Sequence, residues 1–349
     1  MASIVSVGTA VPPHLMPQDM AKHLAGEHFR PHIANVEKYL AVFTSALVDQ
    51  RYFCVEADWF GRDHTLADKN RLYLAWAERL AIEAIEKAIA GSDVDLGDID
   101  HFIFVSSSGI ATPSLDVLIM NKLGFHPNVR RMPLFGLGCG GGAAGLALGA
   151  RMAGDDDKTT VLLVAVELNS LTFQRDDFAK SNLVAASLFG DGAAAVLIRG
   201  GADGPINVLK STTLLRPRTN NLMGWEFVDS GFRVVFSRRV PDTIRNMMPE
   251  SIENTLADAS VGIDDIASFV FHPGGTRILE AYQKELGRGP TDFRASYAVL
   301  SQFGNMSSAT VLFVLDDEIR NSPHKSGDYG LLAAFGPGFS AETSLLHWA

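Results

Sequence analysis

Residues 138–143 read GCGGGA, and residues 304–309 read GNMSSA. Alignment of the two stretches places Cys139 opposite Asn305, at an offset of 305 − 139 = 166 residues. The same offset, 272 − 106 = 166, places His272 after the apolar run SFVF opposite Ser106 after the run FIFV. An offset shared by separate segments indicates a tandem duplication. We therefore expect two related halves, residues 1–200 and 201–349, with the cysteine in the first and the histidine and asparagine in the second.

Apolar periodicity predicts helices and strands in alternation. Over residues 65–90, small and apolar residues recur on one helical face, and Gly91 ends the pattern. Strand-length apolar runs cover 101–108, 131–138, 159–167 and 192–198, and the second half adds a hairpin around Asp229-Ser230-Gly231, a helix over 241–259 and a strand over 267–271. Strands that are apolar on both faces and alternate with helices predict an α/β fold whose sheet is covered on both sides.

The composition is that of a globular protein. Of the 349 residues, 47% are hydrophobic and 20% are charged, and the formal net charge is −10. The absence of Lys and Arg runs gives no support to nucleic-acid or membrane-surface binding. The N-terminus lacks a basic region ahead of its apolar stretch, and no segment reaches the roughly 18 uninterrupted apolar residues of a membrane span. We expect a cytoplasmic protein.

The two cysteines, Cys54 and Cys139, differ in their surroundings. Two cysteines cannot form a disulfide framework, and their spacing does not suit a metal site. Cys54 lies in the alternating run RYFCVE, where a buried, inert thiol is the ordinary interpretation. Cys139 instead follows a predicted strand and opens a glycine-rich helix, so it is the candidate nucleophile.

Cys139, His272 and Asn305 together suit acyl transfer. A helix N-terminus and a neighbouring imidazolium can lower the pKa of a thiol from roughly 8.5 to below about 7. His272 leaves a core strand ahead of Pro273-Gly274-Gly275, and the amide of Asn305 can donate to an oxyanion. Each residue could instead have a purely structural role. The cysteine could pack in the core, the histidine could be hydrogen-bonded at a strand end, and the asparagine could cap a helix. Their common offset favours a shared catalytic role.

At these residues the sequence resembles the thiolase superfamily, and within it the chalcone synthase-like type III polyketide synthases. The segments that carry the resemblance are LGCGGG around Cys139, FHPGGTRILE from Phe271, FGNMSSATVLFVLD around Asn305, FGDGAAAVLI from Phe189 and AFGPGFSAET near the C-terminus. Ketoacyl synthase III, which performs one condensation with the same three residue types, is the related alternative. The resemblance implies a thiolase-like fold in which two duplicated βαβαβαββ halves form a layered αβαβα core.

The resemblance also implies an activity. A homodimer with no cofactor, metal or acyl carrier protein would take acyl-CoA and malonyl-CoA directly. Cys139 would accept the starter acyl group, and His272 and Asn305 would hold the malonyl thioester during decarboxylative condensation. Extension and cyclisation would give a pyrone, resorcinol or naphthalene type of product.

Further site residues follow from the same resemblance. Phe189 and Phe236 match the gate between the coenzyme A tunnel and the cavity, and Thr112 matches a residue that reaches into the neighbouring subunit. The residues that match the cavity lining and the cyclisation loop are Ser107, Thr172, Phe227, Ser307, Gly336, Pro337 and Gly338. Phe227 stands where chalcone synthase has a small residue, which predicts a reshaped cavity. Basic residues expected before Arg51 are missing, and Lys38 and Arg277 are the possible substitutes for binding CoA phosphates.

Three other functions compete with this interpretation. Gly136, Gly138 and Gly141 spell G-x-G-x-x-G after a predicted strand, and Glu167 ends the next one, as in a dinucleotide-binding oxidoreductase. That pattern leaves His272 and Asn305 without a role. A non-catalytic acyl-binding protein would not need an intact cysteine, histidine and asparagine. A papain-like hydrolase would need a different approach to its cysteine.

Overall fold

A single nine-stranded sheet, seen in a computed structural model, forms the centre of the molecule. The structure describes residues 1–156, 158–202, 204–257 and 259–349. The strand order is β11-β12-β13-β8-β1-β7-β6-β4-β5. The strands are β1 (Ala2–Ala10), β4 (His101–Val105), β5 (Arg130–Leu134), β6 (Thr160–Leu168), β7 (Asp191–Gly200), β8 (Ile206–Leu215), β11 (Ile266–Phe271), β12 (Tyr329–Gly336) and β13 (Ser340–Trp348). The first half thus supplies the strands on one side of the β1–β8 contact and the second half those on the other.

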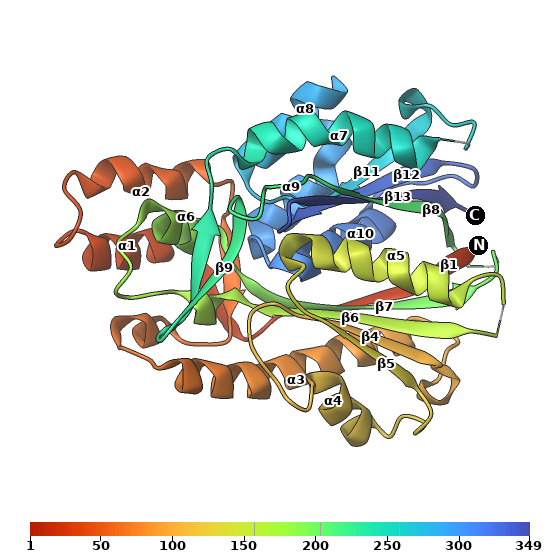
Figure 1. Ribbon diagram of the computed structural model, residues 1–349, viewed down its shortest axis with the longest axis horizontal. Helices are drawn as coiled ribbons and strands as arrows, with labels where there is room; N and C mark the ends of the chain where they lie inside the picture. Colours follow the sequence, from red (N-terminus) through yellow and green to blue (C-terminus); the bar gives the residue numbers. More distant parts are fainter. Residues whose placement is uncertain (157, 203, 258) are drawn as a thin grey trace.

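The elements stack in five layers, as the resemblance implied (Figure 1). Helices α7 (Val240–Leu256) and α8 (Thr276–Leu286) cover the second-half strands, and α3 (Leu66–Ala90) and α4 (Leu115–Leu123) cover those of the first half. Between the two sets of strands lie α5 (Gly141–Ala153) and α10 (Thr310–Asn321). The sheet folds around this central pair because β1 and β8 pair only over Ala2–Ile4. The predicted α/β class and layering are confirmed.

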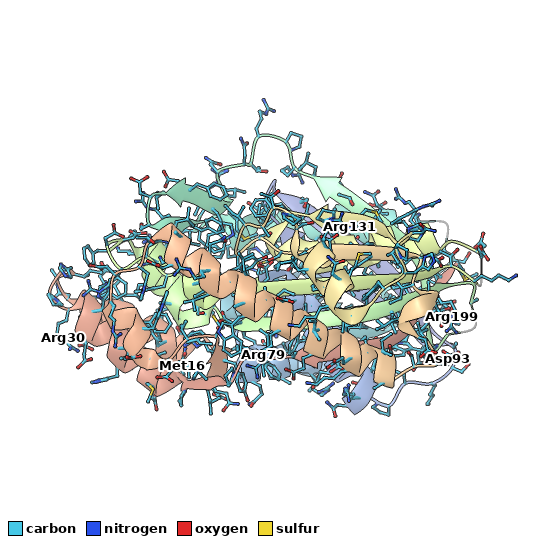
Figure 2. The ribbon with its side chains drawn as sticks, turned by 90° about the horizontal axis from the view of Figure 1, so that it is seen from below. Met16, Arg30, Arg79, Asp93, Arg131 and Arg199 are labelled. Atoms are coloured by element: carbon cyan, nitrogen blue, oxygen red, sulfur yellow. The ribbon has the colours of Figure 1, made fainter. Side chains whose placement is uncertain are left out.

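Helix α3 shows why the sequence pattern was informative. Thr65 caps its first turn by accepting a hydrogen bond from the backbone N–H of Asp68, and Gly91 follows its end. Its alanine face, including Ala77, Ala81, Ala84 and Ala88, is buried, and the opposite face carries the charged residues. Figure 2 shows Arg79 on this helix, with the ion pair of Asp93 and Arg199 beyond its C-terminal end.

Two expectations about strands need correction. The strand predicted over 131–138 ends at Leu134, because Gly136 and Gly138 have left-handed φ values of 87° and 49°. This strand is also an edge strand whose outer residues are exposed, so it is not covered on both faces. The second half has no counterpart to β5 among its described residues. A 3-10 turn, η6 (Pro290–Phe293), and α9 (Arg294–Phe303) occupy that part of the chain.

A group of smaller elements forms one end of the molecule, at the left of Figure 1. It contains α1 (Gln18–Phe29), α2 (Val36–Ser45), α6 (Lys180–Leu188), the pair β2 (His14–Pro17) and β3 (Gln50–Phe53), and the hairpin of β9 (Met223–Val228) and β10 (Gly231–Phe236). The remaining elements are the 3-10 turns η1 (Ala57–Gly61), η2 (Leu96–Asp98), η3 (Gly138–Gly140), η4 (Asn169–Thr172), η5 (Ile263–Asp265) and η7 (Ser307–Ala309). The hairpin and the helix over 240–256 confirm the sequence predictions. Within the described ranges, no helix is both long and apolar enough to cross a bilayer.

Candidate active site

Cys139 lies in η3, where the chain turns from β5 into α5. Its side chain is almost fully buried, and its Sγ lies 4.0 Å from Oδ1 of Asn305. Gly138 positions this turn by donating its N–H to Oγ of Ser107 at 3.2 Å. A Cβ on Gly138 would lie 2.7 Å from Pro337. The turn therefore requires glycine, both for its left-handed φ and for the close approach of the loop after β12.

His272 follows β11 directly, as predicted. Its backbone is fixed because its N–H donates to the carbonyl of Ala333 at 2.8 Å and its carbonyl accepts from the hydroxyl of Tyr282 at 3.0 Å. The side chain is 2% exposed, and neither ring nitrogen has a hydrogen-bond partner among the described residues. A buried imidazole with both nitrogens free is unusual unless a ligand supplies the partner. The described residues therefore leave both ring nitrogens unpaired.

Asn305 is oriented by its own neighbours. Its Oδ1 accepts from the N–H of Ser307 at 2.8 Å, and its Nδ2 donates weakly to the carbonyl of Gly274 at 3.4 Å. Ser307 itself has a left-handed φ of 49°. Because Oδ1 is held by Ser307 and faces the Cys139 thiol, Nδ2 is the atom left to donate to a bound carbonyl.

The three side chains line one cavity of about 50 Å³, which we call the catalytic pocket. Its other lining residues are Gly138, Phe189, Met223, Gly224, Trp225, Val234, Val235, Phe236, Val240, Ile244, Gly274, Ile278, Tyr282, Ser307, Phe335, Pro337 and Phe339. Apart from the three polar side chains and a few hydroxyls, the wall is apolar. Such a wall excludes water from the reacting atoms.

Burial opposes charge on the Cys139 thiol and on the His272 imidazole. It raises the pKa of the Cys139 thiol to about 11 and lowers the pKa of His272 to about 3. The shift of Cys139 is opposite to the one expected from a helix N-terminus alone, because the loss of hydration outweighs that effect. Without substrate, the neutral thiol and the neutral imidazole are the favoured forms.

The other predicted site residues fall into four groups. Phe189, Phe236, Ser307 and Pro337 line the catalytic pocket. Ser107, Gly336 and Gly338 lie beside it: Ser107 holds Gly138, and Gly336 packs on Gly140, whose N would lie 2.9 Å from a Cβ on Gly336. Thr172 and Arg277 line two neighbouring cavities, and Thr112 and Phe227 line none of the described cavities.

Phe227 does not face the catalytic pocket. It is 57% exposed, and its ring packs on Phe232, its partner across the hairpin, at 4.8 Å between centroids. Trp225 shares its face of β9 and does line the pocket, which ends before the strand reaches Phe227. The prediction that Phe227 reshapes this cavity is therefore corrected, because Phe227 lies outside the catalytic pocket and Trp225 is the residue of β9 whose ring lines it.

A second cavity, which we call the cationic pocket, adjoins the first. Its volume is about 730 Å³, and it shares Phe236, Gly274 and Ile278 with the catalytic pocket. Four cationic side chains line it, against the single carboxylate of Glu280; they are Lys38, Lys180, Arg238 and Arg277. Lys38, Arg238 and Arg277 form no ion pair with any described residue. The Nζ of Lys180 lies 4.4 Å from the centroid of the Tyr39 ring.

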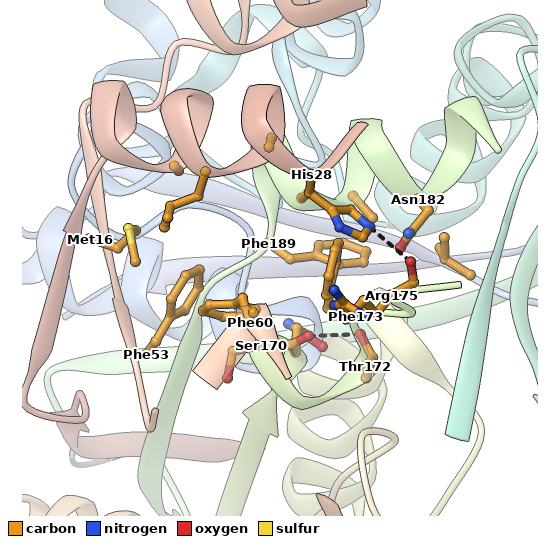
Figure 3. A pocket seen from close by; sticks show the side chains of 18 of the residues that line it. Met16, His28, Phe53, Phe60, Ser170, Thr172, Phe173, Arg175, Asn182 and Phe189 are labelled. Atoms are coloured by element: carbon orange, nitrogen blue, oxygen red, sulfur yellow. Dashed lines mark hydrogen bonds between the residues drawn. The ribbon is translucent and has the colours of Figure 1, made fainter. Parts of the chain in front are cut away.

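A third cavity of about 250 Å³, the apolar pocket, lies on the other side of Phe189 (Figure 3). It is lined by Met16, Ala21, Leu24, Ala25, Glu27, His28, Phe53, Phe60, Gly61, Asn169, Ser170, Thr172, Phe173, Arg175, Asn182, Ala185, Ala186, Phe189 and Val234. Phe189 and Val234 also line the catalytic pocket. The site thus has a polar centre with a cationic cavity on one side and an apolar cavity on another.

Two family models together match nearly the whole chain. "Chalcone and stilbene synthases, N-terminal domain" matches residues 1–204, and "Chalcone and stilbene synthases, C-terminal domain" matches residues 207–349. The chain belongs to this family.

Similar proteins agree with that assignment. A 1,3,6,8-tetrahydroxynaphthalene synthase of Streptomyces peucetius subsp. caesius is 39% identical over 354 residues, which cover 99% of this chain and 93% of the relative. The solved structure of 1,3,6,8-tetrahydroxynaphthalene synthase from Streptomyces coelicolor A3(2), a bacterial type III polyketide synthase, has a TM-score of 0.94 at 28% identity and covers 99% of both chains. The C-terminal type III polyketide synthase domain of Steely1 from Dictyostelium has a TM-score of 0.91 at 26% identity, again over 99% of both chains. The protein is a type III polyketide synthase.

The G-x-G-x-x-G glycines of this polyketide synthase have structural roles. The alternative of a dinucleotide-binding oxidoreductase therefore has no support. A Cβ on Gly141 would lie 2.6 Å from Val105, so this glycine lets α5 pack closely on β4. Glu167 is fully buried and accepts hydrogen bonds from Oγ of Ser308 at 2.6 Å and from the N–H of Ser107 at 3.1 Å. A carboxylate so enclosed cannot reach a ribose. Among the described residues, no cluster of His, Cys, Asp and Glu suits a metal ion.

Among the pocket residues of the polyketide synthase that the sequence did not predict are one aromatic and two cationic side chains. Trp225 lines the catalytic pocket, and Lys180 and Arg238 line the cationic pocket. Trp225 could have been found from the period-two alternation of the hairpin strand, which places residues 223 and 225 on one face. Lys180 and Arg238 carry no local signal. Lys180 on α6 and Arg238, between β10 and α7, lie near Lys38 on α2 and Arg277 on α8 only in the folded chain.

Proposed function

We propose that this type III polyketide synthase loads a starter acyl group from acyl-CoA onto Cys139, extends it with malonyl-CoA and cyclises the product to a pyrone, resorcinol or naphthalene. One observation carries the proposal: a buried thiol lies 4.0 Å from the amide of Asn305, in a pocket also lined by an imidazole whose two nitrogens are unpaired. A nucleophile, a proton carrier and a neutral donor are the set that acyl transfer needs.

Loading begins with proton transfer from the thiol to the imidazole. Because burial disfavours either ion alone, the thiolate of Cys139 forms together with the imidazolium of His272, each stabilising the other. The thiolate attacks the thioester carbonyl of the starter. The C–S bond to CoA breaks, and the departing CoA thiolate takes the proton from His272.

Extension uses the same side chains differently. The ring N–H of His272 and the Nδ2 of Asn305 donate to the carbonyl oxygen of malonyl-CoA. Loss of carbon dioxide leaves its electron pair on the α-carbon, and the resulting enolate is stabilised by these two donors. The enolate attacks the acyl group on Cys139, so a carbon–carbon bond forms and the C–S bond to Cys139 breaks. The extended chain, now a CoA thioester, can be loaded again.

The cationic pocket is the proposed site of the CoA phosphates. Four cations against one carboxylate suit a polyanion, and the shared wall at Phe236, Gly274 and Ile278 joins this pocket to the reacting atoms. From the sequence, Lys38 and Arg277 were the candidates for binding the CoA phosphates. We add Lys180 and Arg238, because they line the same pocket. Arg277→Ala and Arg238→Ala should each raise KM for acyl-CoA several-fold and change it little for the N-acetylcysteamine thioester, which lacks phosphates. Arg199→Ala, at the far end of the molecule, is the control (Figure 2).

The assembly proposed is a homodimer without a prosthetic group or acyl carrier protein. Thr112 is exposed at the surface of the single chain, where the proposal has it reach the neighbouring subunit. Residues 1–200 and 201–349 are proposed as the two halves. A cytoplasmic location remains a prediction.

The test is product formation from defined substrates. The enzyme should be incubated with malonyl-CoA alone and with a panel of acyl-CoAs, and the products identified by mass spectrometry. Cyclised products with two or more extensions are expected, and Cys139→Ala should abolish them all. Release of a singly extended product alone would support a ketoacyl synthase III-like enzyme instead. Failure of every substrate would refute the proposed function.

A further inference from the structure

His272 is held in place through its backbone and not through its ring. Its carbonyl accepts hydrogen bonds from the N–H of Gly274 at 3.1 Å and from the hydroxyl of Tyr282 at 3.0 Å, and its N–H donates to Ala333. Among the described residues, Tyr282 is the only side chain that forms a hydrogen bond with His272. In many histidine sites, a hydrogen bond to one ring nitrogen orients the ring. His272 lacks such a bond, so the placement of its ring depends on these backbone contacts.

Tyr282 is itself firmly packed. It lies on the inner face of α8 and is fully buried. Its ring meets that of Phe271 edge-on at 5.0 Å between centroids, and it stacks on Phe335 at 6.0 Å. These two residues lie at the ends of β11 and β12, and side chains in a close-packed interior keep one rotamer. The hydroxyl of Tyr282 therefore has a fixed position relative to the strand end that carries His272.

The hydroxyl of Tyr282 keeps its proton throughout the reaction. Burial raises the pKa of this hydroxyl well above its usual value, and negative charge on Cys139 raises it further. Tyr282 lines the catalytic pocket together with Cys139 and Asn305. Because this hydroxyl is too weak an acid to release its proton there, it is a constant hydrogen-bond donor to the His272 carbonyl and not a proton carrier.

The hydrogen bond from Tyr282 acts on His272 and not on the strand before it. The preceding residue is held separately, since Ser296 donates to the carbonyl of Phe271 at 2.6 Å. Loss of the Tyr282 hydroxyl would leave the His272 carbonyl paired with the N–H of Gly274, so no buried acceptor would lose every partner. Tyr282→Phe should therefore fold normally and change only how firmly His272 is placed.

We propose that Tyr282 is a positioning residue, which holds the imidazole of His272 where it can take the proton of Cys139 and donate to the malonyl carbonyl. This inference rests on the proposed function, because it assigns a role to Tyr282 in that same site. Displacement of a reacting group is costly, up to about a hundredfold in rate for 1 Å. Since the hydroxyl acts through His272, its effect should vanish when the imidazole is absent.

The first test separates turnover from binding. In Tyr282→Phe, kcat for release of carbon dioxide from malonyl-CoA should fall by roughly tenfold, while KM should change by less than about twofold. Tyr297→Phe is the matched control, because the hydroxyl of Tyr297 accepts a hydrogen bond from Gln283 and its ring lines none of the described cavities. It should keep the wild-type kcat. A wild-type kcat in Tyr282→Phe, or an equal loss in Tyr297→Phe, overturns the inference.

The second test needs no polyketide product. Alkylation of Cys139 by iodoacetamide, followed against pH by peptide mass spectrometry, reports the transfer of its proton to His272. The rate should level off at a higher pH in Tyr282→Phe than in the wild type. In the His272→Ala background, Tyr282→Phe should leave the pH profile as it is. A further shift in that background would mean that Tyr282 acts on Cys139 without His272, which contradicts the inference.

Cys54 shows whether the fold has merely loosened. This thiol is buried and lies outside the catalytic pocket. Faster alkylation of Cys54 in Tyr282→Phe than in the wild type would reveal general loosening and refute the positioning role. If Cys139 shows the expected shift but no substrate gives a polyketide, the link from Tyr282 through His272 stands and the proposed function fails. Polyketides formed at the wild-type rate by Tyr282→Phe would leave the proposed function standing and remove only this inference.

Discussion

The reactivity of Cys139 depends on where its proton can go. With the pKa of the thiol raised to about 11 by burial, thiolate is scarce near neutrality unless His272 accepts the proton. In His272→Ala, the rate of alkylation by iodoacetamide should therefore rise about tenfold per pH unit over the range of roughly pH 7 to 10. In the wild type, the rate should level off at a lower pH.

Peptide mass spectrometry measures this prediction and supplies an internal comparison. Burial also raises the pKa of Cys54 well above its usual value, and this thiol donates no proton to a histidine. Cys54 should react slowly in both proteins. Identical pH profiles at Cys139 in the wild type and in His272→Ala would show that the imidazole does not take its proton.

Glu167 makes the stability of the fold depend on pH. Burial raises the pKa of its carboxyl from the ordinary 4.5 to about 7, so the folded protein holds this proton more tightly than the unfolded chain does. The free energy of unfolding should therefore fall as pH rises between these values, by roughly 3 kcal/mol from this group. Glu167→Gln should flatten that decrease, as measured by urea unfolding at pH 5 and pH 8. The exposed Glu285→Gln is the control, and equal slopes in both variants would count against the assignment.

At the scale of residues, the sequence predicted Cys139, His272 and Asn305 from one offset of 166 residues. His272 directly follows the core strand β11, whereas Cys139 and Asn305 were found from their matching positions ahead of α5 and α10. The pKa shift of Cys139 could not be predicted, because it depends on how completely the surrounding walls exclude water. Lys180 and Arg238 could not be predicted for a related reason. They come together in the cationic pocket only when separate elements pack.

At the scale of elements, the β9–β10 hairpin sets one wall of the catalytic pocket. Trp225 and Phe236 face the pocket, whereas Phe227 lies beyond its end. Trp225→Ala should enlarge the pocket and shift products toward additional extensions, as seen by mass spectrometry. Phe227→Ala also removes an aromatic ring from the same face of β9 and should leave the product distribution as it is. A shift caused by Phe227→Ala and not by Trp225→Ala would restore the role that the sequence assigned to Phe227.

Elements with a strong hydrophobic periodicity were predicted well. Elements whose ends depend on backbone conformation or on tertiary contacts were not. Helix α3 shows a buried alanine face, a capping threonine and a terminal glycine, all visible in sequence. The end of β5 depends on the φ values of Gly136 and Gly138, which an apolar run does not reveal. The missing counterpart of β5 is likewise invisible, because an edge strand contributes few contacts and its loss leaves the other strands of the second half in order.

At the scale of the whole molecule, the two halves meet where the catalytic residues do. Helices α5 and α10 lie together between the strand sets, and Gly142 near the start of α5 packs directly on Ser308 of η7. Cys139 and Asn305 each precede this contact by three residues. The spacing of the halves and the distance between the thiol and the amide are therefore set by one point of close approach.

Gly142→Ala tests that coupling. A Cβ at this position would lie 2.2 Å from the carbonyl oxygen of Ser308 and 2.9 Å from Val311, so α5 and η7 must separate. We expect a loss of about 1 to 3 kcal/mol in the free energy of unfolding. We also expect kcat/KM to fall by at least about tenfold, since a displacement near 1 Å at reacting groups is costly. Gly97→Ala is the control, because no atom lies within 4 Å of its added Cβ. If Gly142→Ala destabilised the fold but kept full activity, the spacing of the halves would not set the geometry of the thiol and the amide.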